Sequence, residues 1–170
     1  DGKLLVNGWH DDQLLFIDYN GVFVVVQDDE KFNIYSSRQS KFISENGFDK
    51  VIRSEHTLFN CGWCGVQIEG KYTFVNEDGI LAEGRYDMIH NFKYGFAGVL
   101  LDGRKNYLTS EGMLLSDVWF EEISAFSRSK RAVVKINGKY NIIDSTGALL
   151  LSDTIQNIAS IGPIESEYFK

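Results

Sequence analysis

The chain has 170 residues, of which 44% are hydrophobic, and this is enough for one compact domain with a sizeable core. Its net charge of -7 argues against a nucleic-acid partner, because phosphate binding needs a basic surface. No run approaches the roughly 18 apolar residues of a membrane helix, so we expect a soluble protein without membrane insertion. No signal peptide is recognisable. The chain starts at Asp1 rather than Met, which leaves open a processed or excised chain and a cytoplasmic or exported location.

An internal repeat runs along the chain. Its front part is a polar residue, a Gly and a cation within the next two residues, and a second polar–Gly pair ends nine residues after the first Gly. Three clear copies have their first glycine at Gly70, Gly103 and Gly138, so successive copies are 33 and 35 residues apart. A weaker copy without these glycines begins at Glu30.

The back part of the repeat is an aromatic–acid–x–apolar segment followed by Phe-x-x-Gly-apolar-Ala-x-Val. Residues 59–66 and 92–99 match at an offset of 33, and residues 126–133 form a looser copy with one extra residue. In chain order we expect one repeat domain, residues 1–170, made of a partial unit 1–27, units at about 28–68, 69–101 and 102–136, and a degenerate unit 137–170.

Each repeat consists of short strands. Val, Ile, Phe and Tyr dominate runs bounded by Gly, Asn and Asp, which is typical of strands. In the clearest copy we expect strands over residues 72–76, 80–82, 88–92 and 96–101. The polar–Gly pairs between apolar runs indicate tight hairpins, because Gly takes the positive φ that such turns need. No window shows a sustained helical period, so the sequence predicts an all-β fold.

These segments occur in the order of a known repeat. The clearest copy carries Gly70 to Tyr72, then Asp78 with Gly79, then Tyr86 with Asp87, and finally residues 92–99. In this order the pattern resembles the WG (KWG) repeat of many bacterial proteins, over residue 1 to about residue 160. The resemblance implies repeats that act as interaction surfaces or spacers, and it implies no enzymatic activity.

One position departs from the WG pattern in every copy. Where the family has a Gly after the first aromatic residue, this chain has Asn33, Thr73, Asn106 and Asn141. Asn tolerates positive φ better than other non-Gly residues, so the three Asn could keep a glycine-like backbone. Thr73 could do so only at a cost.

The motif Cys-Gly-Trp-Cys at residues 61–64 suggests a redox site. In thioredoxin-like proteins a helix N-terminus lowers the pKa of the first thiol. The repeat alignment instead places Cys61 on Tyr94 and Cys64 on Ala97, within a strand pair that offers no helix dipole. We therefore expect Cys64 to fill a small-residue position in the core.

Histidines give no recognisable site either. His56 and His90 could join the two cysteines in a zinc site, but zinc needs four ligands and the spacing is poor. His10 is followed by two aspartates, and a solvated turn explains that cluster more simply than catalysis. We expect no metal and no other cofactor.

Paired carboxylates could supply the acid and base of a glycosidase, with Glu121 and Glu122 or residues 28–30 as candidates. However, Asp49, Asp87 and Glu121 occupy one repeat position. A residue that recurs in every copy more plausibly accepts hydrogen bonds from local backbone donors at a strand entry. We therefore expect no enzymatic activity.

Trp119 and a basic segment are the candidate partner contacts. Phe120 aligns with core positions, so strand alternation places Val118 on the core side and Trp119 outward. An outward Trp could anchor a partner or stack on a sugar, and it could equally pack under the next repeat. Arg128, Lys130 and Arg131, with Arg104 and Lys105, form the only cationic concentration, which indicates a solvated loop or a contact with an acidic partner.

The architecture follows from the repeat. A strand unit of about 35 residues cannot bury its apolar face alone, so each unit must pack on its neighbours. We expect tandem antiparallel units stacked as an open β-solenoid or spiral, with a closed, propeller-like array as the alternative. The predicted function is a non-catalytic interaction or scaffold module that binds a protein or surface partner. The alternatives are a carbohydrate-binding or carbohydrate-active protein, or a redox enzyme, built on the repeats.

Overall fold

The computed structural model of the protein describes residues 13–17, 23–28, 30–52 and 58–152. Every regular element in these ranges is a β-strand, and every strand pair is antiparallel. This confirms the prediction of an all-β fold made of tandem antiparallel units. None of the described residues belongs to a helix that could cross a membrane.

The chain divides into two compact halves, an N-terminal half, Asp1–Ala82, and a C-terminal half, Glu83–Lys170. The grouping of residues 1–170 into one repeat domain stays a prediction, and so does the choice between an open and a closed array.

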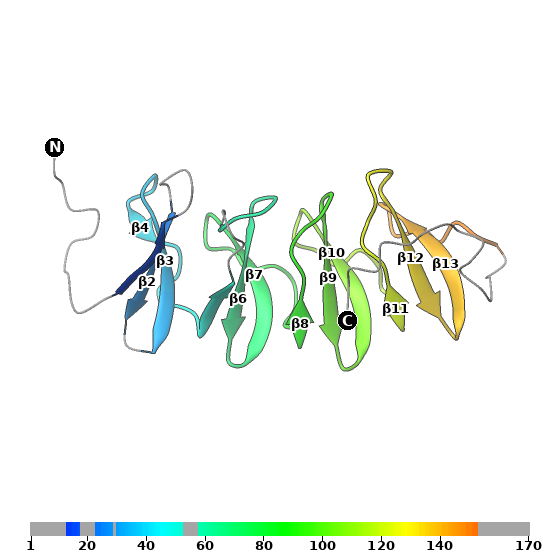
Figure 1. Ribbon diagram of the computed structural model, residues 1–170, viewed down its shortest axis with the longest axis horizontal. Helices are drawn as coiled ribbons and strands as arrows, with labels where there is room; N and C mark the ends of the chain where they lie inside the picture. Colours follow the sequence, from blue (N-terminus) through cyan, green and yellow to red (C-terminus); the bar gives the residue numbers. More distant parts are fainter. Residues whose placement is uncertain (1–12, 18–22, 29, 53–57, 153–170) are drawn as a thin grey trace. The chain divides into compact units, whose positions relative to one another are not determined.

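The N-terminal half contains two sheets (Figure 1). The first has the order β1-β2-β3-β4 and consists of β1 (Gln13–Ile17), β2 (Phe23–Asp28), β3 (Lys31–Ser36) and β4 (Lys41–Phe42). The second has the order β5-β6-β7 and consists of β5 (Lys50–Ile52), β6 (Trp63–Ile68) and β7 (Lys71–Asn76). A reciprocal pair of backbone hydrogen bonds between Phe32 and Phe48, of 2.7 and 2.8 Å, joins the two sheets.

The C-terminal half repeats this plan. One sheet has the order β10-β9-β8 and consists of β8 (Met88–Ile89), β9 (Phe96–Leu101) and β10 (Arg104–Thr109). The other has the order β11-β12-β13 and consists of β11 (Glu122–Ile123), β12 (Arg131–Ile136) and β13 (Lys139–Asp144). Lys105 and Phe120 exchange backbone hydrogen bonds of 2.8 and 2.9 Å, so the sheet-to-sheet link seen at Phe32 recurs.

The predicted strands are confirmed where they are long and shortened elsewhere. Strands β7 and β9 match the predictions over residues 72–76 and 96–101 within one residue. The strand predicted over 88–92 contains only β8. Residues 80–82 form a single bridge, Val75 to Leu81, because a turn at 77–79 and bends at 83–84 leave only a short segment between them.

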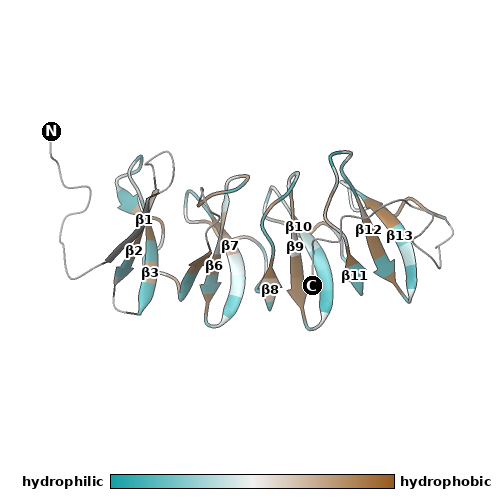
Figure 2. Ribbon diagram, viewed as in Figure 1, coloured by the Kyte–Doolittle hydropathy of each residue, from teal (hydrophilic) through white to brown (hydrophobic). Residues whose placement is uncertain are grey.

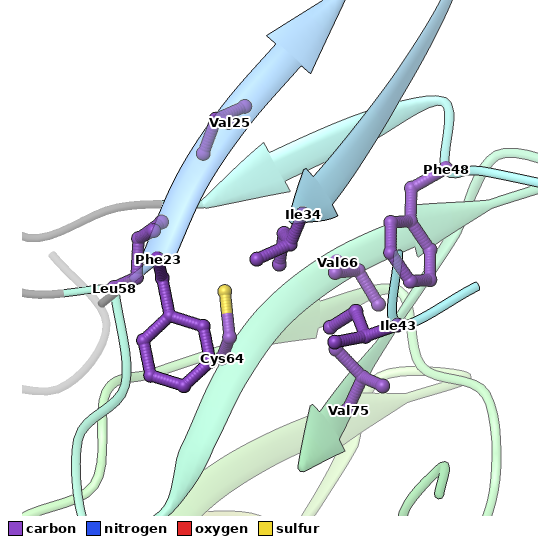
Figure 3. Close-up of a cluster of buried hydrophobic side chains, with 9 residues drawn as sticks. All are labelled: Phe23, Val25, Ile34, Ile43, Phe48, Leu58, Cys64, Val66 and Val75. Atoms are coloured by element: carbon purple, nitrogen blue, oxygen red, sulfur yellow. The ribbon is translucent and has the colours of Figure 1, made fainter. Parts of the chain in front are cut away.

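Each half has its own apolar core. Figure 3 shows the N-terminal core, in which Phe23, Ile34 and Cys64 converge with Val66 and Val75. In the C-terminal core the rings of Phe96 and Phe126 stack with centroids 3.9 Å apart, and Tyr107 meets Phe126 edge to face at 4.8 Å. Figure 2 shows β9 as hydrophobic along its length, as expected for a central strand with neighbours on both sides.

Two turn glycines allow neighbouring sheets to approach closely. Gly79 has φ of 86°, and a Cβ at this position would overlap the carbonyl oxygen of Ile43 from the preceding sheet. Gly147 has φ of 85°, and a Cβ there would overlap the carbonyl oxygen of Leu115 in the same way. Only Gly satisfies both the left-handed backbone and the close approach.

The position that departs from the WG pattern does not behave as expected. The three Asn and Thr73 do not have positive φ, and all four lie within strands. The glycine-like backbone predicted for Asn33, Asn106 and Asn141 is therefore wrong. The physical reason is that an extended strand needs negative φ at this position.

The side chains at this position instead bond to the chain that returns after the strand. Each Asn amide nitrogen donates to a carbonyl about ten residues later, and each amide oxygen accepts from the next backbone N–H. The first set of bonds is Asn33 to Ser44 at 2.7 Å, Asn106 to Ser116 at 2.7 Å and Asn141 to Leu151 at 3.0 Å. Thr73 makes the equivalent bond to the carbonyl of Ala82 at 3.5 Å. The repeat therefore holds its own return segment through a polar side chain that is buried at Thr73, Asn106 and Asn141.

Candidate functional site

The three-stranded sheets have a hairpin end and a tip end. At the hairpin end, the turns at Glu69–Gly70, Asp102–Gly103 and Asn137–Gly138 have consecutive φ values of 53° and 76°, 50° and 75°, and 51° and 74°. Two consecutive positive φ values define the tight type I′ turn, which confirms the hairpins predicted from the polar–Gly pairs.

A carboxylate stabilises each hairpin end. Asp49 accepts from the backbone N–H of Gly70 at 3.3 Å, and Asp87 accepts from that of Asp102 at 2.8 Å. Glu121 accepts from the N–H of Gly138 at 3.1 Å. The expectation that these residues satisfy local backbone donors is confirmed.

Several of the described acid groups have lowered pKa values. The pKa of Asp49 is lowered, first by the hydrogen bond from the Lys31 ammonium and then by the N–H of Gly70. The pKa of Glu122 is lowered chiefly by the Lys135 ammonium, 2.8 Å away. Among the described carboxyls every resolved shift is downward, whereas a general acid that works near neutral pH needs a raised pKa.

The two cysteines have different environments. Cys64 is fully buried in the N-terminal core, and burial raises the pKa of its thiol to about 12. Cys61 is exposed in the turn before β6. Neither forms a disulfide. The prediction that Cys64 fills a core position is confirmed, and its environment is opposite to that of a redox-active thiolate.

Of the three histidines, the structure describes only His90. His10, its neighbouring aspartates and His56 lie outside the described residues. His90 is half-buried, and burial lowers its pKa. In the ranges that the structure describes, no three His, Cys, Asp or Glu side chains could hold a metal ion.

The placement predicted for Val118 is wrong. Val118 is 40% exposed, whereas Trp119 is partly buried and its ring centroid lies 6.4 Å from that of the buried Tyr86. Strand alternation fails because residues 116–119 form bends and coil, and Phe120 takes part only in an isolated bridge. Trp119 thus packs against Tyr86 of the preceding repeat, whereas the alternative considered from the sequence was packing under the next repeat.

The tip end carries the turns that precede the central strands. In the turns at Asn60–Trp63 and Lys93–Phe96, residues Cys61 and Tyr94 have φ of 53° and 54°, and a Gly follows each. The third turn, Ser127–Arg131, is one residue longer and closes with a bond from the Ser127 N–H to the Arg131 carbonyl at 2.9 Å. The extra residue seen in the sequence therefore lies at the tip.

The basic residues do not form one patch. Arg104 and Lys105 lie at the hairpin end, where Arg104 pairs with Glu121 at 3.9 Å and Lys105 donates to the Glu121 carbonyl at 3.2 Å. Arg128, Lys130 and Arg131 are exposed at the tip end of β12. The two groups belong to opposite ends of the sheets.

Tyr94 joins the basic tip, although the sequence did not single it out. The Arg128 Nε donates to the Tyr94 hydroxyl at 3.3 Å, which raises the pKa of Arg128. The Lys93 ammonium lies 5.9 Å from the centroid of the Tyr94 ring, within cation–π range. We call Lys93, Tyr94, Arg128, Lys130 and Arg131 the cationic tip.

Three cations of the tip lack a close carboxylate in the part of the chain that the structure describes. No carboxylate of the described residues forms an ion pair with Arg128, Lys130 or Arg131. Glu111 and Asp144 attract Lys130 and Arg131 at longer range, but the pKa of each acid is lowered mainly by neighbouring hydroxyl groups, those of Thr109 and Ser110 for Glu111 and that of Thr146 for Asp144. The tip can therefore accept further negative charge.

Comparison with known families identifies the repeat. The family model of the WG containing repeat matches residues 73–104 and 120–140. For these two stretches, the resemblance to the WG repeat is confirmed. The matched stretches contain β9 and β12, the central strands of the two C-terminal sheets, together with β8 and β11, the short strands that precede them.

Distant likenesses to solved structures accompany the WG match. Kluyveromyces lactis Hsv2 with complete loop 6CD is 11% identical and matches 85% of this chain and 49% of its own, at a TM-score of 0.39. Dihydro-heme d1 dehydrogenase NirN is 12% identical over 83% of this chain and 36% of its own, at 0.38, and BamB from Moraxella catarrhalis is 12% identical over 79% and 47%, at 0.37. The chain spans about half the length of Hsv2 and BamB, and TM-scores this low assign it no function. No curated protein matches the sequence.

Proposed function

We propose that this WG-repeat chain is a non-catalytic interaction module that binds a protein partner through the cationic tip. One observation carries the proposal. The lengthened turn at Ser127–Arg131 exposes three cations, and Arg128 is held by Tyr94 from the turn of the neighbouring sheet. In repeat proteins, insertions map to loops on one face, and this face is often the binding face.

The two ends of the sheets differ in whether their polar groups already have partners within the chain, and this difference supports the proposal. At the hairpin end, the backbone donors of the turns are bonded to Asp49, Asp87 and Glu121. At the tip, the side chains of Lys130 and Arg131 extend into solvent. Tyr and Arg are the residue types that most often supply binding energy at protein interfaces, and the tip places one of each in contact.

The absence of catalysis is part of the proposal and has separate support. The recurring carboxylates are occupied by backbone N–H groups, and Cys64 is sealed in the core. Trp119, the candidate for a sugar platform, has its ring against Tyr86. An enzyme or a carbohydrate-binding surface would need such carboxylates, thiols or aromatic rings to be available, and here each of them already contacts another part of the chain.

Site-specific photo-crosslinking tests the proposal. A photoreactive amino acid at Ser129 reports on the tip, and the same residue at Lys139 reports on the hairpin end of the same sheet. We expect a discrete crosslinked protein from position 129 that is absent from position 139 in cells that express the chain. Equal crosslinking from both positions, or none from 129, would overturn it. Binding to an oligosaccharide array that is lost on Trp119→Ala would support the carbohydrate alternative instead.

A further inference from the structure

We infer that the cationic tip recognises a short acidic peptide segment, a run of Asp and Glu side chains, on the partner. This inference rests on the proposed function and specifies the chemistry of the partner. It is carried by local charge, by the way Arg128 is held, and by the backbone of Tyr94.

The local charge is opposite to that of the whole chain. Residues 91–98 and 126–133, the two segments that form the tip, contain four basic residues and no acidic residue, although the chain has a net charge of -7. Two acids from other segments, Glu111 and Asp144, interact with Lys130 and Arg131, so the basic residues remain in excess. Charges act over about 8 Å at physiological salt, so a short acidic segment is attracted by the tip while the rest of the chain is screened. A long polyanion such as nucleic acid, or an extended anionic membrane, would also meet the acidic remainder. The charge pattern therefore favours a short acidic peptide.

The guanidinium of Arg128 is held in a way that favours binding of a carboxylate. Its Nε is committed to the Tyr94 hydroxyl at 3.3 Å, and this bond restrains the plane of the guanidinium. Among the described residues no bond engages its two terminal nitrogens. A guanidinium binds a carboxylate through two parallel N–H donors, so a restrained plane loses less conformational freedom on binding.

The backbone of Tyr94 has a conformation that Asn or Gly adopts more easily. Its φ of 54° lies in the left-handed region, which disfavours bulky side chains, and type I′ turns prefer Asn or Gly there. Its side chain is nevertheless 40% exposed and adds little to the core. The Tyr94 side chain is exposed and its hydroxyl accepts a hydrogen bond from Arg128, which indicates that the hydroxyl positions Arg128.

Two acidic side chains of the chain itself partly offset the charge of the tip. Glu111 contributes attraction to Lys130, and Asp144 does the same for Arg131, in both cases without a close ion pair. The tip is thus partly neutralised in the free chain, and a bound acidic segment completes the neutralisation.

Fluorescence anisotropy with a labelled peptide of about six glutamates, long enough to span the tip, tests the inference. We expect binding that weakens about tenfold when Arg128→Glu and Lys130→Glu are combined, because two attractions become repulsions. Lys139→Glu, combined with Arg104→Glu, makes the same charge change at the hairpin end and should alter affinity less than about twofold. Equal weakening by both double variants, or no binding at low salt, would overturn the inference.

Tyr94→Asn separates positioning from folding. Asn followed by Gly95 is a preferred type I′ turn, so the melting temperature should rise while peptide affinity falls about threefold. Unchanged affinity in this variant would overturn the positioning role of Tyr94. Circular dichroism confirms that each variant is folded.

Two further probes decide between sources of negative charge. A single-stranded RNA oligonucleotide and vesicles of phosphatidylserine are titrated under the same conditions. Tighter binding of either probe than of the peptide, with the same loss in the Arg128/Lys130 variant, would overturn the choice of an acidic peptide. If crosslinking from position 129 captures a partner but the glutamate peptide does not bind, the proposed function stands and only this inference fails.

Discussion

The two ends of each three-stranded sheet are built under different constraints. At the hairpin end, every turn has the same length, the same pair of positive φ values and a carboxylate from the same repeat position. At the tip end, the turns before the central strands carry Cys61, Tyr94 or the lengthened segment Ser127–Arg131. The comparison indicates that one end determines how a repeat folds, and that the other is free to differ.

We call the buried core and the hairpin end of each sheet its frame. The largest difference between the frame and the tip should be in the rate of thiol alkylation. Cys61 lies in an exposed tip turn, whereas Cys64, three residues later, is buried with a pKa raised to about 12. In the native protein at about pH 8, we expect iodoacetamide to modify Cys61 at least about a hundredfold faster, since the thiolate is the nucleophile. Mass spectrometry of timed samples measures both rates. Comparable rates would mean that the core around Cys64 opens readily.

Asn106→Ala should destabilise the buried part of the repeat. The Asn106 side chain is fully buried, donates to the carbonyls of Ser116 and Val118, and accepts from the N–H of Tyr107. Its loss leaves buried backbone groups without partners, so we expect the free energy of unfolding to fall by about 3 kcal/mol. Ser129→Ala at the tip is the control and should change it by less than about 0.5 kcal/mol. Urea denaturation measures both, and a similar loss in the two variants would contradict the division into frame and tip.

Asp87→Ala tests the hairpin end with a smaller effect. The carboxylate of Asp87 accepts from the backbone N–H of Asp102 at 2.8 Å, much as a capping side chain does at a helix terminus. We expect a loss of about 1 kcal/mol in the free energy of unfolding. Asp117→Ala removes an exposed carboxylate from a bend and should be close to neutral. If the two variants lose the same stability, the recurring carboxylate is not part of the frame.

The pH dependence of stability should show the smallest effect. The pKa of Asp49 is lower in the folded chain than in the unfolded one, mainly because of the Lys31 ammonium. The stabilisation is therefore fully present above the unfolded pKa of about 4 and is lost as the pH falls through the lower folded pKa. Lys31→Ala should flatten the melting temperature between about pH 2 and 5, and Lys50→Ala, another exposed lysine of this half, should not.

Local rules made the frame predictable from the sequence. The strands around Gly103 follow from apolar runs separated by a polar–Gly turn, and the role of Asp49, Asp87 and Glu121 follows from their shared repeat position. Cys64 was placed in the core because it aligns with Ala97, and both are fully buried. Each of these predictions depends on backbone geometry that the repeat imposes over a few residues.

The remaining features depend on contacts that no local pattern specifies. Asn106 was expected at positive φ because Asn tolerates it, but its position within β10 requires an extended backbone. Val118 was misplaced because alternation was extended beyond the strand. The bond from Arg128 to Tyr94 joins residues 34 apart, and the clue available was that both align to the turn before a central strand.

The glycines that fit against the preceding sheet have a consequence for how such a chain can grow. Gly147 lies against the carbonyl of Leu115, and Gly79 against that of Ile43, so at both places the same part of the repeat meets the same backbone. A DNA segment that encodes 33 to 35 residues therefore carries both the surface that docks and the surface that receives the next copy. A tandem duplication of that segment yields a protein that already fits together, and its new tip can diverge without a compensating change elsewhere.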